Sequence, residues 1–201
     1  MNATLEAPQT ETQLSNLRRS RPIRAARPAE RIVLTGFMGS GKSTIGPLLA
    51  AELGWNFVDL DAEIERRTGL SVPQIFAERG EAAFRKEETA ALVTALGYAR
   101  AVIALGGGAP ETLANRLLLE QTPATAVVYL AAPFATLAAR CAQQPGNVRP
   151  NFTDHAAETR FATRQPLYQR LAHVSVETGS LSPEDSVAAV LAAVAAKASL
   201  G

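Results

Sequence analysis

Cysteine and histidine are scarce in this 201-residue sequence, which has only Cys141, His155 and His173. A single cysteine cannot form an internal disulfide or build a thiolate zinc site, and two histidines add too little for a His/Cys metal cluster. Long hydrophobic runs are missing as well, because the longest, Val187–Ala196, has ten residues and ends at Lys197. Such a run is too short to cross a bilayer, and no apolar segment of the secretory kind stands near the N-terminus. These absences favour a protein of the reducing cytoplasm that neither spans a membrane nor carries a thiolate metal centre.

A large excess of either charge is also absent. The chain has 20 lysines and arginines against 19 aspartates and glutamates, a formal net charge of +1. Six arginines and three glutamates fall in residues 1–31, which leaves 14 basic and 16 acidic residues in the remainder. Nucleic-acid binding through phosphate contacts needs a concentrated basic surface, so the main body is not expected to bind nucleic acid.

The first 29 residues differ in composition from the rest. They show no helical or strand periodicity and are rich in arginine, alanine, proline, serine and threonine. We therefore predict a disordered Arg-rich arm over residues 1–29 and one folded domain over residues 30–201. An organelle transit peptide and a bacterial N-terminal extension both agree with this composition, and the lack of an amphipathic stripe favours the extension.

From Arg31 onward, short β-branched runs alternate with alanine- and leucine-rich segments, and the chain is 47% hydrophobic, enough for a buried core. The predicted strands are Ile32–Thr35, Asn56–Asp59, Ala101–Leu105, Ala126–Leu130 and His173–Val176. The predicted helices are Lys42–Leu53, Asp61–Arg67, Val72–Glu78, Glu81–Leu96, Glu111–Glu120, Pro133–Ala142, Ala157–Leu171 and Pro183–Ala198. This alternation predicts an α/β fold with a five-stranded parallel sheet covered by helices on both faces. Ligands of such sheets bind at the carboxyl ends of the strands.

The segment Gly36–Thr44 follows the first predicted strand, opens a helix and matches the pattern G-x-x-x-x-G-K-[ST]. Its glycines allow main-chain N–H groups to approach phosphate oxygens, and the following helix adds the partial positive charge of its N-terminus. In such a loop Lys42 binds the β- and γ-phosphates, and the hydroxyl of Ser43 can ligate Mg²⁺. The segment therefore predicts a binding site for a nucleoside triphosphate. No N-K-x-D base-reading motif of GTPases is present, and the chain length suits a small phosphotransferase.

Two aspartates stand at the end of the second predicted strand. If the backbone stays extended through them, Asp59 and Asp61 face the same side at the ligand-binding edge of the sheet. One could then hold a water on Mg²⁺ while the other binds a sugar-like hydroxyl and takes its proton. The alternative is that Asp61 only caps the helix that follows.

Two more features lie further along the chain. Arg85 and Glu88 are three residues apart, so a surface salt bridge is one interpretation of this pair. The other is that Phe84 holds the arginine against the core, where its guanidinium can bind a carboxylate. The triplet Gly106–Gly108 packs nothing and loses conformational entropy on folding, which favours close approach of the main chain to a ligand over a plain turn.

Together these motifs resemble those of the shikimate kinase family. The resemblance rests on the Gly36–Thr44 loop, the Asp59 and Asp61 pair, Phe84-Arg85, Gly106–Gly108 and the run Arg164-Gln165-Pro166-Leu167-Tyr168, and it extends from about Arg31 to Ala196. It implies a three-layer P-loop kinase fold with a mobile lid. It also implies an enzyme of aromatic amino acid biosynthesis that phosphorylates the 3-hydroxyl of shikimate with ATP and Mg²⁺. A cytoplasmic monomer is expected, with no nucleic-acid or membrane partner.

The resemblance further implies how the acceptor is held. Asp61, Arg85, Gly107 and Arg164 match the positions that contact shikimate in this family. The two arginines are expected on the carboxylate of shikimate and Asp61 on its hydroxyls. Asp61 is expected to orient the hydroxyl that attacks ATP, and it either takes the proton of that hydroxyl as well or only orients it.

On the nucleotide side, the resemblance implies that Ser43 ligates Mg²⁺ directly and Asp59 through water. Asn147–Pro150 is similar to the arginine-bearing lid of the family, so Arg149 joins Lys42 and Asp61 as a catalytic residue. The lid departs from the usual Arg-Pro-Leu-Leu, because here the residues after the arginine are Pro-Asn-Phe. The implied ATP-binding residues are Gly39, Ser40, Gly41, Lys42, Ser43, Thr44, Arg149 and Pro183.

Two other functions agree with parts of the sequence. One is a related P-loop kinase for another small acceptor, such as gluconate or a nucleoside monophosphate; the arginine pair and the glycine triplet favour a compact hydroxy acid over these. The other is a non-catalytic ATP-binding module that uses its arginine-rich arm to bind nucleic acid or acidic partners. Such a module predicts a salt-dependent interaction that is lost when residues 1–29 are deleted.

Overall fold

The sheet at the centre of the molecule contains five parallel strands in the order β2-β3-β1-β4-β5. A computed structural model of the chain describes residues 29–143 and 155–199. The strands are β1 (Arg31–Thr35), β2 (Asn56–Asp59), β3 (Ala101–Ala104), β4 (Thr125–Ala131) and β5 (Val174–Glu177). The predicted five-stranded parallel sheet is confirmed. Nearly all of the predicted arm and the whole predicted lid segment Asn147–Pro150, with Arg149, lie outside the described residues.

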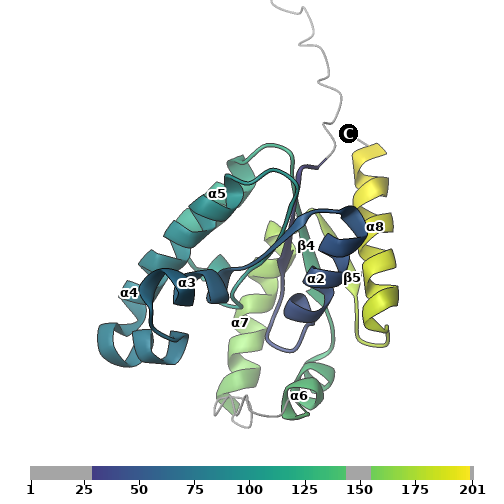
Figure 1. Cartoon of the computed structure of the whole chain (residues 1–201). Helices are drawn as coiled ribbons and strands as arrows, with labels where there is room; N and C mark the ends of the chain where they lie inside the picture. The colour runs from purple at the N-terminus through teal and green to yellow at the C-terminus, as the bar shows by residue number, and fades with distance from the viewer. Residues whose placement is uncertain (1–28, 144–154, 200–201) are drawn as a thin grey trace, which may run out of the picture.

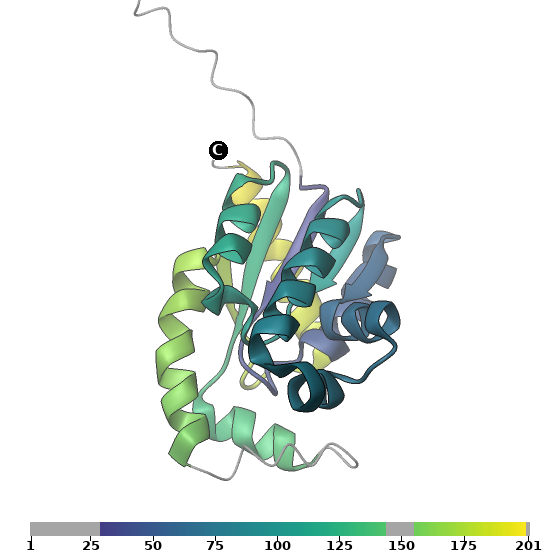
Figure 2. The same cartoon turned by 90° about the vertical axis from the view of Figure 1, so that its left-hand side faces the viewer.

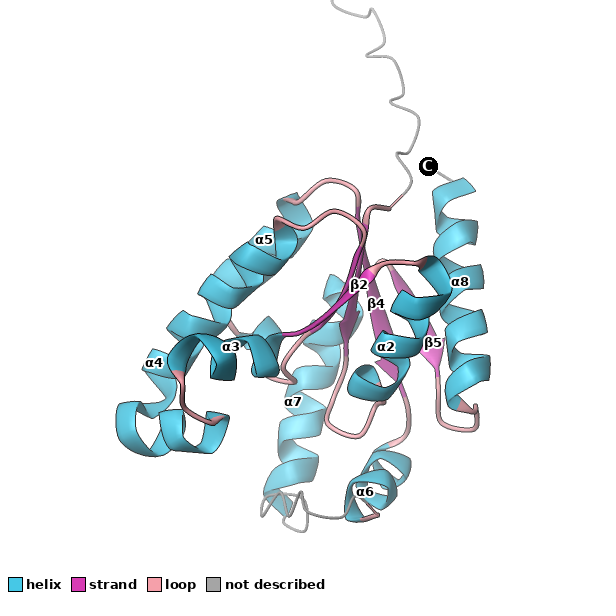
Figure 3. Cartoon of the chain, in the orientation of Figure 1, coloured by secondary structure: helices cyan, strands magenta, loops and turns pink. Residues whose placement is uncertain are grey.

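Helices cover both faces of the sheet (Figures 1 and 3). They are α2 (Lys42–Leu53), α3 (Leu60–Thr68), α4 (Val72–Leu96), α5 (Leu113–Gln121), α6 (Phe134–Ala142), α7 (His155–Leu171) and α8 (Pro183–Ser199), with a short 3₁₀ helix η1 (Ala109–Glu111). The predicted ends of the elements fall within about two residues of these. Among the described residues, no helix has the length and apolar character needed to cross a membrane.

Two apolar layers hold the helices to the sheet, because alternate side chains of a strand point to opposite faces. Ile32 and Leu34 of β1 pack in a cluster with residues of α2 and α8. Val33, which lies between them, packs on the other face with residues of α3, α4, α5 and α7. Figure 2 looks onto this second layer. Since both faces are buried, the strands are apolar along their whole length rather than alternating with polar residues.

Helix α4 contains a sharp kink at Gly80, whose backbone angles are φ 77° and ψ 172°. The helix begins at a capping box, in which the Ser71 side chain accepts from the N–H of Gln74 and the Gln74 side chain accepts from the N–H of Ser71. A left-handed φ is strained for residues other than glycine, so Gly80 allows the chain to turn between two helical segments. The two helices predicted on either side of Gly80 are therefore parts of this one kinked element.

The carboxyl ends of β1, β2 and β3 lead to the same edge of the sheet, because the strands are parallel. Strand β1 lies in the middle, and Val33 is paired with Ile103 of β3 and with Val127 of β4. In the sheet order, β2 lies on one side of β1, whereas β5 lies on the opposite side of β4. The connections that follow β1 and β4 therefore run in opposite directions along the sheet. Such a change of direction opens a crevice at the strand ends, and this is where the candidate site lies.

Two adjacent residues of α4 test how much this packing stabilises the fold. Leu92 is fully buried, whereas the side chain of its neighbour Val93 is 53% exposed. We expect Leu92→Ala to lower the free energy of unfolding by about 2–5 kcal/mol, because it leaves a cavity in the core. Val93→Ala, the matched control, should change it by no more than about 0.5 kcal/mol. Urea unfolding measures both, and similar losses for the two variants would contradict the packing described here.

Candidate active site

The loop after β1 folds around the ammonium group of Lys42. Gly39 and Gly41 have φ angles of 79° and 97°, in the left-handed region that glycine adopts without strain. Lys42 Nζ donates hydrogen bonds to the main-chain carbonyls of Gly36 (2.7 Å) and Phe37 (3.0 Å). Helix α2 begins at Lys42, so its N-terminal dipole is directed at this loop. The loop thus has the conformation that a phosphate-binding segment needs.

Asp59 connects the second strand to the phosphate loop. Its Oδ1 accepts from the main-chain N–H groups of Asp61 (3.0 Å) and Ala62 (3.4 Å), so Asp59 is the N-cap of α3. Its Oδ2 accepts from the hydroxyl of Ser43 at 2.9 Å. The expectation that the backbone stays extended through Asp61 is wrong, because Asp61 already belongs to the first turn of α3. The residue that caps the helix is Asp59.

The pair of Ser43 and Asp59 offers oxygen atoms of the kind that Mg²⁺ prefers. Mg²⁺ commonly keeps several waters and takes only one or two protein oxygens beside the phosphates of its substrate. In the described part of the chain, no three or more histidine, cysteine, aspartate or glutamate side chains form a group able to hold a metal ion. A hydroxyl and a carboxylate 2.9 Å apart beside the phosphate loop fit Mg²⁺ in the presence of a nucleotide.

One cavity of about 600 Å³ brings most of the predicted site residues together. The predicted residues that line it are Gly39, Gly41, Lys42, Ser43, Thr44, Asp59, Asp61, Gly107, Arg164 and Pro183. Ser40 of the same loop is fully buried and does not line the cavity, and its Oγ lies 3.4 Å from Lys42 Nζ. Arg140 is an additional lining residue, and its guanidinium donates to the main-chain carbonyls of Thr178 (2.5 Å) and Gly179 (3.3 Å).

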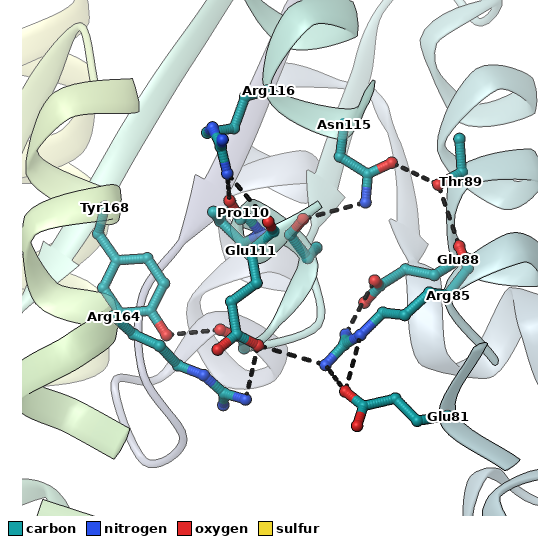
Figure 4. Close-up of polar contacts among 12 residues, drawn as sticks. Glu81, Arg85, Glu88, Thr89, Pro110, Glu111, Asn115, Arg116, Arg164 and Tyr168 are labelled. Carbon is teal, nitrogen blue, oxygen red and sulfur yellow. Dashed lines mark hydrogen bonds and ion pairs between the residues drawn. The ribbon is translucent and has the colours of Figure 1, made fainter. Parts of the chain in front are cut away.

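Arg85 lies beside this cavity and is held by three carboxylates (Figure 4). Its Nη1 is 3.0 Å from Glu88, and its Nη2 is 3.1 Å from Glu81 and 3.3 Å from Glu111. The guanidinium carbon also lies 5.4 Å from the centre of the Phe84 ring. Burial opposes the charge of Arg85, but Glu88 and the other carboxylates raise its pKa above the ordinary value. The arginine is therefore charged and fixed in place.

The ion pair of Arg85 and Glu88 is a buried one rather than the surface salt bridge that their spacing also suggested. The Glu88 side chain is only 1% exposed. Burial raises its pKa to about 7, the charge of Arg85 opposes this shift, and the charges of Asp61 and Glu111 add to it. Glu88 Oε1 is buried and makes no hydrogen bond within the described structure. A carboxyl group in these surroundings carries a proton over part of the neutral pH range.

Arg164 approaches the same place from helix α7. Its Nη2 is 2.8 Å from Oε2 of Glu111, the carboxylate oxygen that also contacts Arg85 (Figure 4). From the next turn of α7, the hydroxyl of Tyr168 donates to the main-chain carbonyl of Gly107 at 2.5 Å. Burial raises the pKa of Tyr168, so its hydroxyl remains a donor. Sequence reasoning missed Glu111 altogether, because only the fold brings η1 between α4 and α7.

The glycine triplet leaves space for charged side chains of the protein itself. A Cβ atom at Gly108 would lie 2.5 Å from Arg85 Nη2 and 2.9 Å from Glu111 Oε2. At Gly106 it would lie 2.8 Å from Glu88 Oε1 and 2.9 Å from Asp61 Oδ1. A side chain at Gly106 or Gly108 would therefore displace charged groups of the ionic cluster.

Gly107 differs from its two neighbours in the triplet. A Cβ atom there would have no neighbour closer than 3.8 Å, and the residue lines the cavity. Gly108 also lines the cavity, but of the three glycines only Gly107 has free space around its Cβ position.

Comparison with known proteins agrees with this geometry. The family described as shikimate kinase matches residues 38–195. The shikimate kinase of Chlorobium chlorochromatii is 46% identical over 157 residues, which cover 73% of this chain and 81% of that protein. The shikimate kinase of Nitrosomonas europaea is 42% identical over 158 residues, 75% of this chain and 72% of that protein.

Solved structures show the same likeness. Shikimate kinase from Acinetobacter baumannii in complex with shikimate superposes with a TM-score of 0.75 and 35% identity, and the match covers 84% of this chain and 94% of that one. A gluconokinase from Sinorhizobium meliloti superposes with a TM-score of 0.59 at 22% identity, covering 86% of this chain and 96% of that one, which shows only a shared fold. By sequence and by structure, this chain belongs to the shikimate kinase family.

Proposed function

We propose that Lys42, Asp61, Arg85 and Arg164 carry out the transfer of the γ-phosphoryl group of ATP to the 3-hydroxyl of shikimate. The observation that supports these roles is that one cavity joins the phosphate loop to Asp61, Gly107 and Arg164, while Arg85, outside the lining, contacts the same Glu111 oxygen as Arg164. A donor and an acceptor bound in one cavity can react in line, and phosphoryl transfer needs little more than position and charge neutralisation from the protein.

On the nucleotide side, Lys42 neutralises charge on the phosphates. Its ammonium now contacts carbonyls of Gly36 and Phe37, and a bound phosphate offers it a stronger, charged acceptor in the same loop. Ser43 and Asp59 would hold Mg²⁺, which when bound neutralises the β- and γ-phosphates further. Pro183 also lines the cavity, and the nucleotide base would lie against it. The role of Arg149 stays a prediction from the sequence.

On the acceptor side, the arginines bind a carboxylate and Asp61 orients a hydroxyl. Arg85 and Arg164 reach the same point from two different helices, as their shared contact with Glu111 demonstrates. Asp61 lines the same cavity as Arg164 and Lys42. An acceptor with a carboxylate at one end and a hydroxyl at the other therefore fits, and Asp61 can take the hydroxyl proton as phosphate is transferred.

The test is an ADP-release assay with shikimate, gluconate and nucleoside monophosphates as acceptors, with Mg²⁺ present or removed by a chelator. We expect turnover with shikimate and with none of the other acceptors. This turnover should be lost when Mg²⁺ is removed. Asp61→Asn should abolish turnover with ATP binding retained, because the amide cannot accept the hydroxyl proton. Turnover with gluconate but not shikimate would replace the proposed acceptor, and an active Asp61→Asn variant would exclude Asp61 from proton transfer.

Replacement of Arg85 tests the carboxylate site separately. Arg85→Ala should raise the KM for shikimate by the equivalent of about 2–4 kcal/mol, or roughly 30- to 1000-fold, because a desolvated charge pair is lost. The KM for ATP should change little. Arg66→Ala removes the same charge from a side chain that is 72% exposed, and it should leave both constants as they are. A parallel rise in both KM values for Arg85→Ala would contradict this role.

The buried carboxyl group of Glu88 makes a separate prediction about stability. Its pKa is about 7 in the folded protein against 4.5 ordinarily, so folding binds a proton between these pH values. As far as this group is concerned, stability is greatest below pH 4.5 and falls by on the order of 3 kcal/mol as the pH rises from there through about 7. Glu88→Gln cannot titrate, so this decline should disappear.

Urea unfolding at a series of pH values measures the effect. The exposed Glu120 on α5 provides a matched control, since Glu120→Gln removes the same charge and should keep the decline of the wild type. A decline of equal size in Glu88→Gln would show that another group is responsible.

A further inference from the structure

The carboxylate of Glu111 lies at the point where the two arginines of the acceptor site meet (Figure 4). Its Oε2 is 2.8 Å from Arg164 Nη2 and 3.3 Å from Arg85 Nη2. Glu111 ends the 3₁₀ helix η1, which follows directly after the glycine triplet. A carboxylate of the protein thus occupies the position in which the proposed function puts the carboxylate of the substrate.

Glu111 binds only some of the N–H donors that the two arginines offer. A guanidinium binds a carboxylate best through two parallel N–H donors. Glu111 takes only one Nη2 group from each arginine and meets both with a single oxygen. Nε of Arg164 is buried and has no hydrogen-bond partner in the described structure. A free carboxylate that approached Arg164 through Nε and Nη2 would therefore satisfy a donor that Glu111 leaves unused.

Glu111 is more exposed than Glu88, the partner of Arg85 on the side that faces the core. The Glu88 side chain is 1% exposed and that of Glu111 is 35% exposed. Water can solvate the Glu111 carboxylate when it leaves the arginines, and an incoming carboxylate then takes its place beside them, so the exchange costs little net free energy. Glu111 can therefore move into solvent at small cost, whereas Glu88 cannot.

We propose that Glu111 is a specificity-determining residue that competes with the substrate for the arginine pair. With no acceptor bound, the Glu111 carboxylate is the anion that the two arginines share. An acceptor must displace it, and only a ligand that gains other contacts, such as those of its hydroxyls with Asp61, does so effectively. Small carboxylates and inorganic anions lack these contacts and are rejected. This inference rests on the proposed function, and it identifies Glu111 as the residue that sets the affinity of the site for shikimate.

Steady-state kinetics of Glu111→Gln in the full-length chain test this proposal. The amide keeps the size of the side chain but loses its charge, so the KM for shikimate should fall by about three- to tenfold. Both kcat and the KM for ATP should stay unchanged. Inhibition by acetate, which competes for the arginines but cannot reach Asp61, should become stronger by a similar factor. Glu120→Gln, the control of equal charge, should alter none of these values.

A second variant keeps the test independent of the folding of the first. Glu111→Asp retains the charge but is one methylene shorter, so it cannot reach both arginines and should also lower the KM, although less. An unchanged or higher KM for shikimate in these variants would overturn the proposal, since Glu111 would then support the arginines rather than compete with the substrate. A wild-type chain that does not phosphorylate shikimate would instead refute the proposed function, which separates the two failures.

Discussion

The pairing of β1 between β3 and β4 is the constraint on which the whole site depends. Because β1 is hydrogen-bonded on both edges and packed on both faces, the start of the phosphate loop has a fixed position. Parallel pairing then brings the ends of β2 and β3, with Asp59 and the glycine triplet, to the same edge. Helices α4 and α7 add one arginine each from outside the sheet. The part of the site that binds the nucleotide therefore depends on the strands. The part that binds the acceptor carboxylate comes from helices that pack on them.

Two guanidinium groups held near the protein interior would be costly without compensating charge. The structure meets this requirement with carboxylates of its own, and the packing of these groups explains residues that otherwise have no evident purpose. Gly106 gives space to Glu88 and Asp61, and Gly108 gives space to Arg85 and Glu111. The ionic cluster is thus assembled before any ligand arrives. Its geometry does not have to be created at the expense of binding energy.

Most of the fold could be predicted from the sequence, because strands and helices alternate with clear hydrophobic periods and the phosphate loop follows a fixed local pattern. The local prediction for Asp61 failed because the Asp59 carboxylate binds the N–H groups that an extended backbone would leave free. Glu111 could not be predicted at all. It lies 26 residues from Arg85 and 53 from Arg164, so its role exists only once α4, η1 and α7 have packed together.

Two of the three acidic partners of Arg85, Glu88 and Glu111, differ in burial and therefore in role. Glu88 is enclosed, so removing it would leave the core-facing Nη1 of Arg85 without its carboxylate partner. It acts as a permanent support. Glu111 is partly exposed and shared between both arginines, so its loss from the site is compensated by water on one side and by the incoming carboxylate on the other. An anion site needs both kinds of partner: one to fix the cation, and one weak enough to be exchanged for the ligand.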